Sequence, residues 1–311
     1  MAFISIKMMA YNPAPTTDVY NGGRGISFND SWNFYHGDAS GASGIAFNDA
    51  SWRKLNLPHD FGIENAFNPS SPATSEGGFL DGGVAWYRKT FILPDNYNGK
   101  SISITFDGSF MNTEVWINGN YIGIRPYGFI TFQYDITPFL KYGSTANVIA
   151  VKINNIQKSC RWYSGSGIYR NVWLTVLNPV HIAFCGSAVT TPLVSNSSAS
   201  IAMNTDVQNQ ATISQNVTLS STVFDNTGVS VASGNSTSKV LSAGSTNSLT
   251  TNITVSTPTL WSLENPYLYT LKTYVMINSL KVDSFSSTVG FRNAVFNANT
   301  GFSLNGKKIK I

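Results

Sequence analysis

The amino-acid sequence predicts an all-β protein built from antiparallel β-sandwiches, and three observations support this fold class. Many short segments rich in β-branched and aromatic residues alternate with turn signals along the 311 residues. No long apolar repeat has the 3.6-residue period of a helix. Hydrophobic residues make up 42% of the chain and charged residues only 12%, which is typical of a lightly charged globular protein.

The first group of expected strands begins near Gly25 and carries Trp32 as a candidate for the core. Alternating Ile and Phe residues predict a buried strand over 102–106, and the dipeptide Asn118-Gly119 is a strong hairpin-turn signal. The other segments with strand composition are 55–58, 86–93, 114–117, 121–122, 132–134, 148–153 and 169–176. Short strands at this spacing are typical of a sandwich.

The composition changes near Pro179, after which Ser, Thr and Asn are abundant. This part of the chain is predicted to form a second, smaller sandwich of roughly immunoglobulin type. Its expected strands lie at 217–224, 248–255, 267–277 and 281–285. We therefore divide the chain into three units, residues 1–180, 181–288 and 289–311.

The stretch SCRWYSGSGIYRNVWLTV, residues 159–176, combines a tight loop with a strand. Gly165 and Gly167 can adopt positive φ, so the backbone can turn sharply there. The triplet Arg161-Trp162-Tyr163 is then expected on a loop at the mouth of a strand, where rigid scaffolds often present binding groups. The Pro-, Ser-, Asn- and Gly-rich stretch 61–84 is a second candidate, since loops this long are often functional.

These residues also carry a family resemblance. RWYSGSGIYRNVWL resembles the signature of the N-terminal sandwich domain of glycoside hydrolase family 2, the group of β-galactosidases, β-glucuronidases and β-mannosidases. Further motifs agree in order and spacing: LNLPHD (55–60), GGVAWYRKTFILP (82–94), FDGSFMNTEVWINGNYIG (106–123), WSLENPYLY (261–269) and VGFR (289–292). Together they cover nearly the whole chain and look most like the β-galactosidase branch.

The resemblance implies a jelly-roll-like, galactose-binding-like sandwich followed by an immunoglobulin-like one. Residues 289–311 resemble the lead-in to the family's (β/α)₈ barrel, but no βα alternation follows, so we expect the barrel to be absent from this chain. Without it, this segment is expected to be extended and poorly packed. Phe291, Phe296 and Phe302 would then expose apolar surface, through which the chain could form a homo-oligomer.

The resemblance implies retaining hydrolysis of O-glycosyl bonds, with both catalytic glutamates supplied by the barrel. The first sandwich would contribute a loop to the sugar pocket, with Arg161, Trp162 and Asp60 as candidate substrate-binding residues. The position of Arg161 often carries an acidic residue in the family. A guanidinium only donates hydrogen bonds, so Arg161 would donate to a sugar oxygen, pair with a barrel carboxylate, or pin its own loop.

The other two candidates also have alternative interpretations. Trp162 could stack on a pyranose ring, as could Tyr163, or either ring could pack beneath the loop. Asp60, which ends the LPHD motif, could face the pocket or cap a local turn.

Within the chain itself we expect no catalytic residue, no metal site and no cofactor. Glycoside hydrolysis needs two carboxyl groups that face each other. Four glutamates were considered and show no pairing of this kind: Glu64, Glu76, Glu114 and Glu264. The three histidines are scattered, and no helix follows the GSG sequence to make a nucleophile elbow. Two other functions remain open, a free-standing carbohydrate-binding module and a structural or interaction pair of sandwiches.

Composition limits the partners. The net charge of +4 comes from 20 basic and 16 acidic residues without a long basic run, so we expect no nucleic acid. No apolar run approaches the ~20 residues of a membrane span, so we expect no membrane either. The expected partners are the missing barrel and, through the complete enzyme, a β-galactoside-like carbohydrate. Cys160 and Cys185 are expected to be free thiols, and we assign no compartment.

Overall fold

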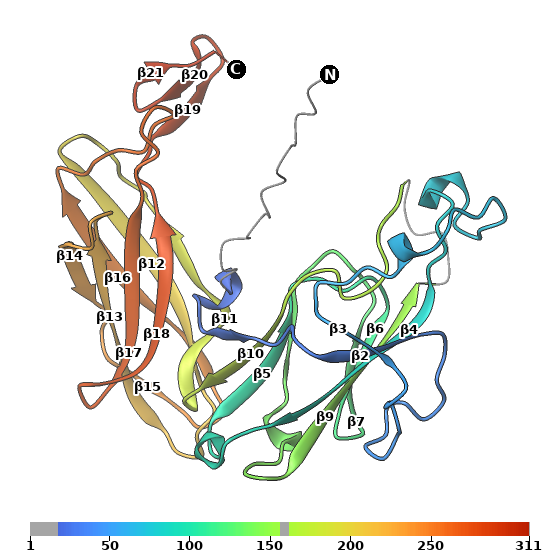
Figure 1. Ribbon diagram of the computed structural model, residues 1–311. Coiled ribbons are helices and arrows are strands. Elements are labelled where there is room, and N and C mark those ends of the chain that lie inside the picture. Colours follow the sequence, from blue (N-terminus) through green and yellow to red (C-terminus); the bar gives the residue numbers. More distant parts are fainter. Residues whose placement is uncertain (1–17, 156–161, 311) are drawn as a thin grey trace, which may run out of the picture.

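The structure is a computed structural model that describes residues 18–155 and 162–310. Figure 1 shows two β-sandwiches side by side and a small sheet beyond the second one, which confirms the predicted all-β class. Five short 3₁₀ turns are the helical segments of these residues: η1 (Val19–Asn21), η2 (Gly62–Glu64), η3 (Ser75–Gly77), η4 (Asp95–Tyr97) and η5 (Thr137–Phe139). None of these helical segments has the length and the apolar composition of a membrane-spanning helix.

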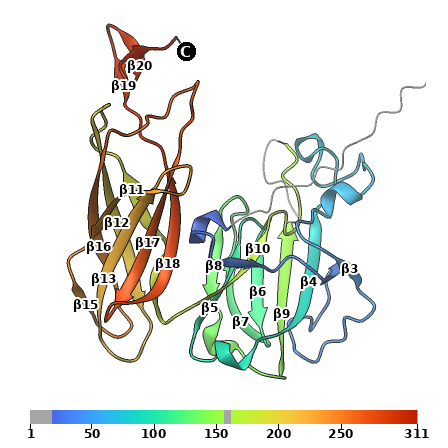
Figure 2. The ribbon, with the colours of Figure 1, turned by 60° about the vertical axis from the view of Figure 1, so that its left-hand side comes forward.

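The first sandwich packs a four-stranded sheet against a six-stranded sheet (Figure 2). The four-stranded sheet has the order β1 (Gly25–Ser27), β10 (Val172–Leu177), β5 (Ser101–Phe106), β8 (Phe132–Asp135). The six-stranded sheet has the order β3 (Arg53–Leu55), β2 (Trp32–His36), β4 (Gly83–Ile92), β9 (Ala146–Asn155), β6 (Thr113–Ile117), β7 (Asn120–Arg125). Large side chains from both sheets and from the loops fill the core between them, among them Trp32, Phe61, Tyr87, Phe106 and Phe132.

Two local predictions for this sandwich are confirmed. Ile102, Ile104 and Phe106 alternate along β5 and are buried in the core. Asn118 and Gly119 join β6 to β7 with φ of 50° and 80°, the left-handed conformation that a two-residue hairpin turn requires.

Two predicted strand boundaries are wrong. The observed strand β3 spans Arg53–Leu55 and shares only Leu55 with the strand expected over 55–58. Beyond it, the Leu57 N–H donates at 2.9 Å to the carbonyl of Asn29, which lies outside β2. The strand expected from residue 169 begins at Val172. Before it, the Arg170 N–H makes a long hydrogen bond of 3.3 Å to the Gly108 carbonyl, and the Tyr169 hydroxyl donates to the Gly128 carbonyl at 2.9 Å.

The second sandwich has a three-stranded and a five-stranded sheet. The first has the order β11 (Val180–Thr190), β12 (Ser198–Asn209), β16 (Thr246–Ser256). The second has the order β14 (Ser230–Asn235), β13 (Gln215–Phe224), β17 (Tyr269–Ile277), β18 (Leu280–Val289), and β15 (Lys239–Leu241) also pairs with β13. The sequence pattern did not predict β11 or β12.

The C-terminal segment differs from the expectation. Residues 294–308 form a separate three-stranded meander of β19 (Ala294–Asn297), β20 (Gly301–Leu304) and β21 (Lys307–Lys308). Phe291 is fully buried in the second sandwich, with its ring centroid 5.0 Å from that of Tyr269, so its predicted exposure is wrong. Phe296 is 76% exposed, as expected, and its ring contacts the partly buried ring of Phe302.

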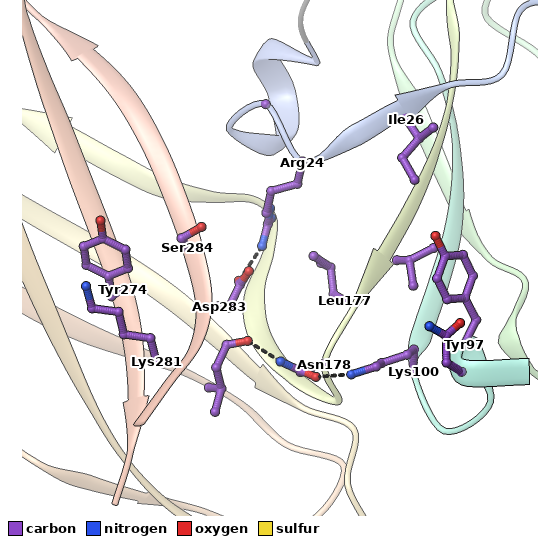
Figure 3. A pocket seen from close by; sticks show the side chains of 14 residues that line it. Arg24, Ile26, Tyr97, Lys100, Leu177, Asn178, Tyr274, Lys281, Asp283 and Ser284 are labelled. Carbon is purple, nitrogen blue, oxygen red and sulfur yellow. Dashed lines mark hydrogen bonds and ion pairs between the residues drawn. The ribbon is translucent and has the colours of Figure 1, made fainter. Parts of the chain in front are cut away.

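Arg24 connects the two sandwiches (Figure 3). Its Nη1 lies 2.5 Å from Oδ2 of Asp283 in β18, and its Nη2 donates to the carbonyl of Ile182 in β11 at 3.0 Å. The side chains of this ion pair are only 7% and 5% exposed. An unpaired charge that is buried this deeply strongly destabilises a fold. A change of orientation that separates Arg24 from Asp283 is therefore unfavourable, and the pair holds the sandwiches in one relative orientation.

Asp18 is a buried carboxyl group just before η1, with 1% of its surface exposed. Neither carboxylate oxygen accepts a hydrogen bond of good geometry from a described residue, although Asn21 and Arg24 lie close enough to favour its charged form. Burial raises the pKa of Asp18, and the neighbouring charge of Asp107 raises this pKa further. The ionised form of Asp18 therefore destabilises the fold.

We expect Asp18→Asn to raise the free energy of unfolding at neutral pH and to leave it unchanged below about pH 3. The folded-state pKa of Asp18 lies above the ordinary 3.8. The wild type therefore loses stability as the pH rises from the ordinary pKa through the higher folded-state pKa. Chemical denaturation across pH measures the difference. Asp225→Asn is the control with the opposite sign, since hydrogen bonds from Thr227 lower the pKa of Asp225. An equal gain for Asp18→Asn at every pH contradicts the account.

Candidate functional site

We call residues 162–167, the described part of the predicted binding loop, the signature loop. Gly165 and Gly167 have φ of 82° and 132°, which confirms the predicted need for glycine. A Cβ on Gly167 would lie 2.5 Å from the Tyr87 hydroxyl oxygen and 2.6 Å from the His59 carbonyl oxygen. Gly167 also exchanges two backbone hydrogen bonds of 2.9 Å with Phe110. The loop therefore returns to the sandwich at a tightly fixed point.

The carboxylate of Asp60 anchors the signature loop through hydrogen bonds. The Tyr163 hydroxyl donates to its carboxylate at 2.7 Å, and the backbone N–H of Ser166 donates at 2.9 Å. The N–H of Gly62 donates to the same carboxylate at 3.0 Å, which is the local cap that the sequence suggested. Burial, and then the hydrogen bond to Asp60, raises the pKa of Tyr163, so the phenol stays protonated. This carboxylate joins two loops that are 103 residues apart.

His59 lies in a second cluster beneath the loop. Arg53 Nη2 is 2.8 Å from His59 Nε2, and the guanidinium also pairs with Glu64 at 2.8 Å. His59 Nε2 also lies 3.2 Å from Glu64 Oε1, and Nδ1 lies 2.8 Å from the Tyr87 hydroxyl. Burial lowers the pKa of His59 despite Glu64, which keeps the ring neutral. Neither Arg53 nor Glu64 carried a sequence signal for this cluster.

An apolar hollow of about 420 Å³ lies beside the signature loop. The rings of Phe67, Phe79 and Trp162 line it, and Phe67 and Trp162 are 76% and 69% exposed. Phe79 has φ of 57°, an unusual conformation for a bulky residue that is more often found at functional sites. The long loop over 61–84 and the signature loop thus present aromatic surface together.

The predicted site residues have different outcomes. Asp60 lies under the loop as an anchor, and Trp162 lies on the loop's exposed side. Arg161 lies outside the described residues, as does Cys160. Cys185 is a free thiol, as expected. The sugar-binding roles of Arg161, Trp162 and Asp60 stay predictions.

The acidic residues considered as catalytic candidates lie on different elements. Glu64 is in η2, Glu76 in η3 and Glu114 in β6. Glu264 lies between β16 and β17 and pairs with Lys307 at 3.4 Å. Within residues 18–155 and 162–310, no three His, Cys, Asp or Glu side chains gather as a metal site would require.

Comparison with known families decides the identity. The model of the family 2 glycosyl hydrolase sugar-binding domain matches residues 66–178, and a second model of glycosyl hydrolases family 2 matches residues 180–292. This chain belongs to glycoside hydrolase family 2. The two matches meet between β10 and β11, where the two sandwiches join, so the family 2 chain has its sugar-binding sandwich first.

Curated relatives of this family 2 chain are longer than it is. A β-galactosidase of Bacteroides ovatus is 44% identical over 285 residues, which are 91% of this chain and 33% of that protein. A putative β-glucuronidase of Formosa agariphila is 36% identical over 92% of this chain and 27% of its own length. The chain thus spans about a third of these relatives.

Solved structures give the same result. A family 2 member from Bacteroides cellulosilyticus superposes with a TM-score of 0.87 at 34% identity, over 92% of this chain and 38% of that one. A β-glycosidase from Bacteroides vulgatus gives a TM-score of 0.83 at 37% identity, over 93% and 36%. The two sandwiches of this chain therefore have the family arrangement.

Proposed function

We propose that this chain is the non-catalytic N-terminal region of a retaining family 2 glycosidase that hydrolyses β-galactoside-like substrates. The observation that carries the proposal is the match of both sandwiches to family models over residues 66–178 and 180–292. Identity of 44% to a β-galactosidase supports the substrate class. The catalytic carboxylates would come from a barrel domain, and the sandwiches would support that domain.

The arrangement of the two sandwiches supports this role. In both views, η2 and η3 of the first sandwich and the C-terminal sheet β19–β21 lie at the same end of the molecule (Figures 1 and 2). A barrel joined to the C-terminal sheet would therefore have the 61–84 loop within reach. Phe296, which is 76% exposed on that sheet, would gain a covering surface.

We assign the three candidate residues different tasks in the pocket. Trp162 is 69% exposed and would stack on a pyranose face. Arg161 would donate to a sugar oxygen or to a barrel carboxylate. The carboxylate of Asp60 already accepts hydrogen bonds from two loops, so Asp60 would position the loop.

The test is an assay with an aryl β-galactoside. We expect no turnover by the chain alone, because glycoside hydrolysis needs two facing carboxyl groups. We expect turnover by a chimera in which this chain replaces the matching third of the Bacteroides ovatus β-galactosidase. Turnover by the chain alone that one carboxylate substitution abolishes in a folded protein would contradict the proposal. A folded but inactive chimera, with galactoside binding by the chain alone, would favour a free-standing binding module.

A further inference from the structure

A cleft of about 680 Å³ lies between the two sandwiches (Figure 3). None of its lining residues belongs to the signature loop or to the 61–84 loop. Tyr97 and Lys100 stand on the wall formed by the first sandwich, and Tyr274 and Lys281 on the wall formed by the second. Its volume is within the ~300–1,000 Å³ that is usual for small-ligand sites.

The cleft has a fixed shape because its floor is tied on both sides. The Arg24–Asp283 pair joins the walls at 2.5 Å. Asn178, in the connection between the sandwiches, accepts a hydrogen bond from Lys100 Nζ at 2.7 Å and donates to the Val282 carbonyl. A site with preset walls loses little conformational freedom when a ligand binds.

The charge of the cleft is positive. Arg24 and Asp283 neutralise each other, which leaves Lys100 and Lys281, one on each wall. Within the described part of the chain, neither lysine forms an ion pair with a carboxylate. Lys281 Nζ instead lies 3.9 Å from the centroid of the Tyr274 ring, which holds the ammonium group at the wall. An anionic group between the walls would be attracted by both lysines.

The neutral groups of the cleft select among anions. The amide of Asn96 and the hydroxyl of Ser284 offer donors and acceptors, and Tyr97 offers an aromatic ring. A sugar ring matches these groups better than a compact inorganic anion does. Its hydroxyl groups can form hydrogen bonds with an amide while its ring packs against an aromatic side chain.

We propose that the cleft between the sandwiches is a second carbohydrate site, which binds an acidic saccharide bearing a carboxylate or sulfate group through Lys100 and Lys281. The site is independent of the proposed catalytic partner, because both walls belong to this chain.

Calorimetric titration of the 311-residue chain with cellobiouronic acid, a sulfated cellobiose and neutral cellobiose tests the proposal. We expect binding of at least one acidic disaccharide and about tenfold weaker binding of cellobiose, the equivalent of one charge-assisted hydrogen bond. The carboxylate and sulfate ligands identify which group the cleft prefers. Lys281→Gln should weaken acidic binding about tenfold, and Lys281→Arg should retain most of it.

Lys307→Gln is the matched control, since Lys307 is an exposed lysine on the separate C-terminal sheet. Equal weakening by Lys281→Gln and Lys307→Gln would mean attraction to general positive charge and would overturn the proposal. Equal affinity for acidic and neutral disaccharides would overturn it too, as would inorganic sulfate binding as tightly as the sulfated sugar. The proposal would also be overturned if the titrations gave no heat of binding with any of the sugars at about 10 mM. Lys100→Gln should weaken acidic binding as well, and unchanged binding by this variant would overturn the role of the other wall.

Discussion

Asp283→Ala is expected to lower the free energy of unfolding by about 3–5 kcal/mol, the range found when one partner of a buried ion pair is removed. The substitution leaves the Arg24 guanidinium, whose side chain is 7% exposed, without its carboxylate. It also removes the acceptor for the Ile182 N–H, which donates to Asp283 at 2.8 Å. Urea denaturation measures the loss, and we expect the interface between the sandwiches to open first.

An exposed ion pair provides the control for this effect. Lys307 and Glu264 are 75% and 70% exposed, so Glu264→Ala should barely change stability. The double change Arg24→Met with Asp283→Leu should recover most of the loss, because it removes both buried charges. Unfolding of Asp283→Ala at the wild-type denaturant concentration would show that the pair does not hold the sandwiches together.

Asp60→Ala is expected to lower kcat/KM of the chimera by about 10–150-fold, the equivalent of losing ~1.5–3 kcal/mol of charged hydrogen bonding. The substitution frees the Tyr163 hydroxyl and the Ser166 N–H, which hold the signature loop at 2.7 and 2.9 Å. Tyr163→Phe removes only one of these bonds and should have a smaller effect. Steady-state kinetics per folded molecule measures both.

Asp225→Ala is the matched control, because Asp225 also accepts backbone hydrogen bonds in a turn, but in the second sandwich. It should leave kcat/KM unchanged. If Asp60→Ala reduces activity only in proportion to the unfolded fraction, Asp60 stabilises the fold and has no role in positioning the loop.

Much of the first sandwich could be predicted because its signals are local. Alternation at Ile102, Ile104 and Phe106 depends only on the period of a strand. The Asn118-Gly119 turn depends only on two positive φ angles. The sequence pattern did not predict β12, although its alternate apolar residues are buried: Ala199, Ile201, Met203 and Val207. The Ser, Thr and Asn residues between them lower the apolar content of the segment and obscure the alternation.

The contacts that build the site could not be predicted from local signals. Arg24 and Asp283 are 259 residues apart, and their contact depends on how one sandwich faces the other. The cap at Asp60 was foreseen, but its bond to Tyr163 depends on how two distant loops meet. Phe291 was expected to be exposed without the barrel, whereas its ring packs in the second sandwich beside Tyr269.

A crystal structure of the chimera with a galactose-like inhibitor in the barrel tests the central claim most directly. The claim is that this chain contributes its signature loop to the sugar pocket of a family 2 enzyme. We expect Trp162 and Arg161 to lie within about 4 Å of the bound sugar, the distance of direct contact. An active chimera whose inhibitor contacts barrel residues only, with the signature loop out of reach, would contradict the claim.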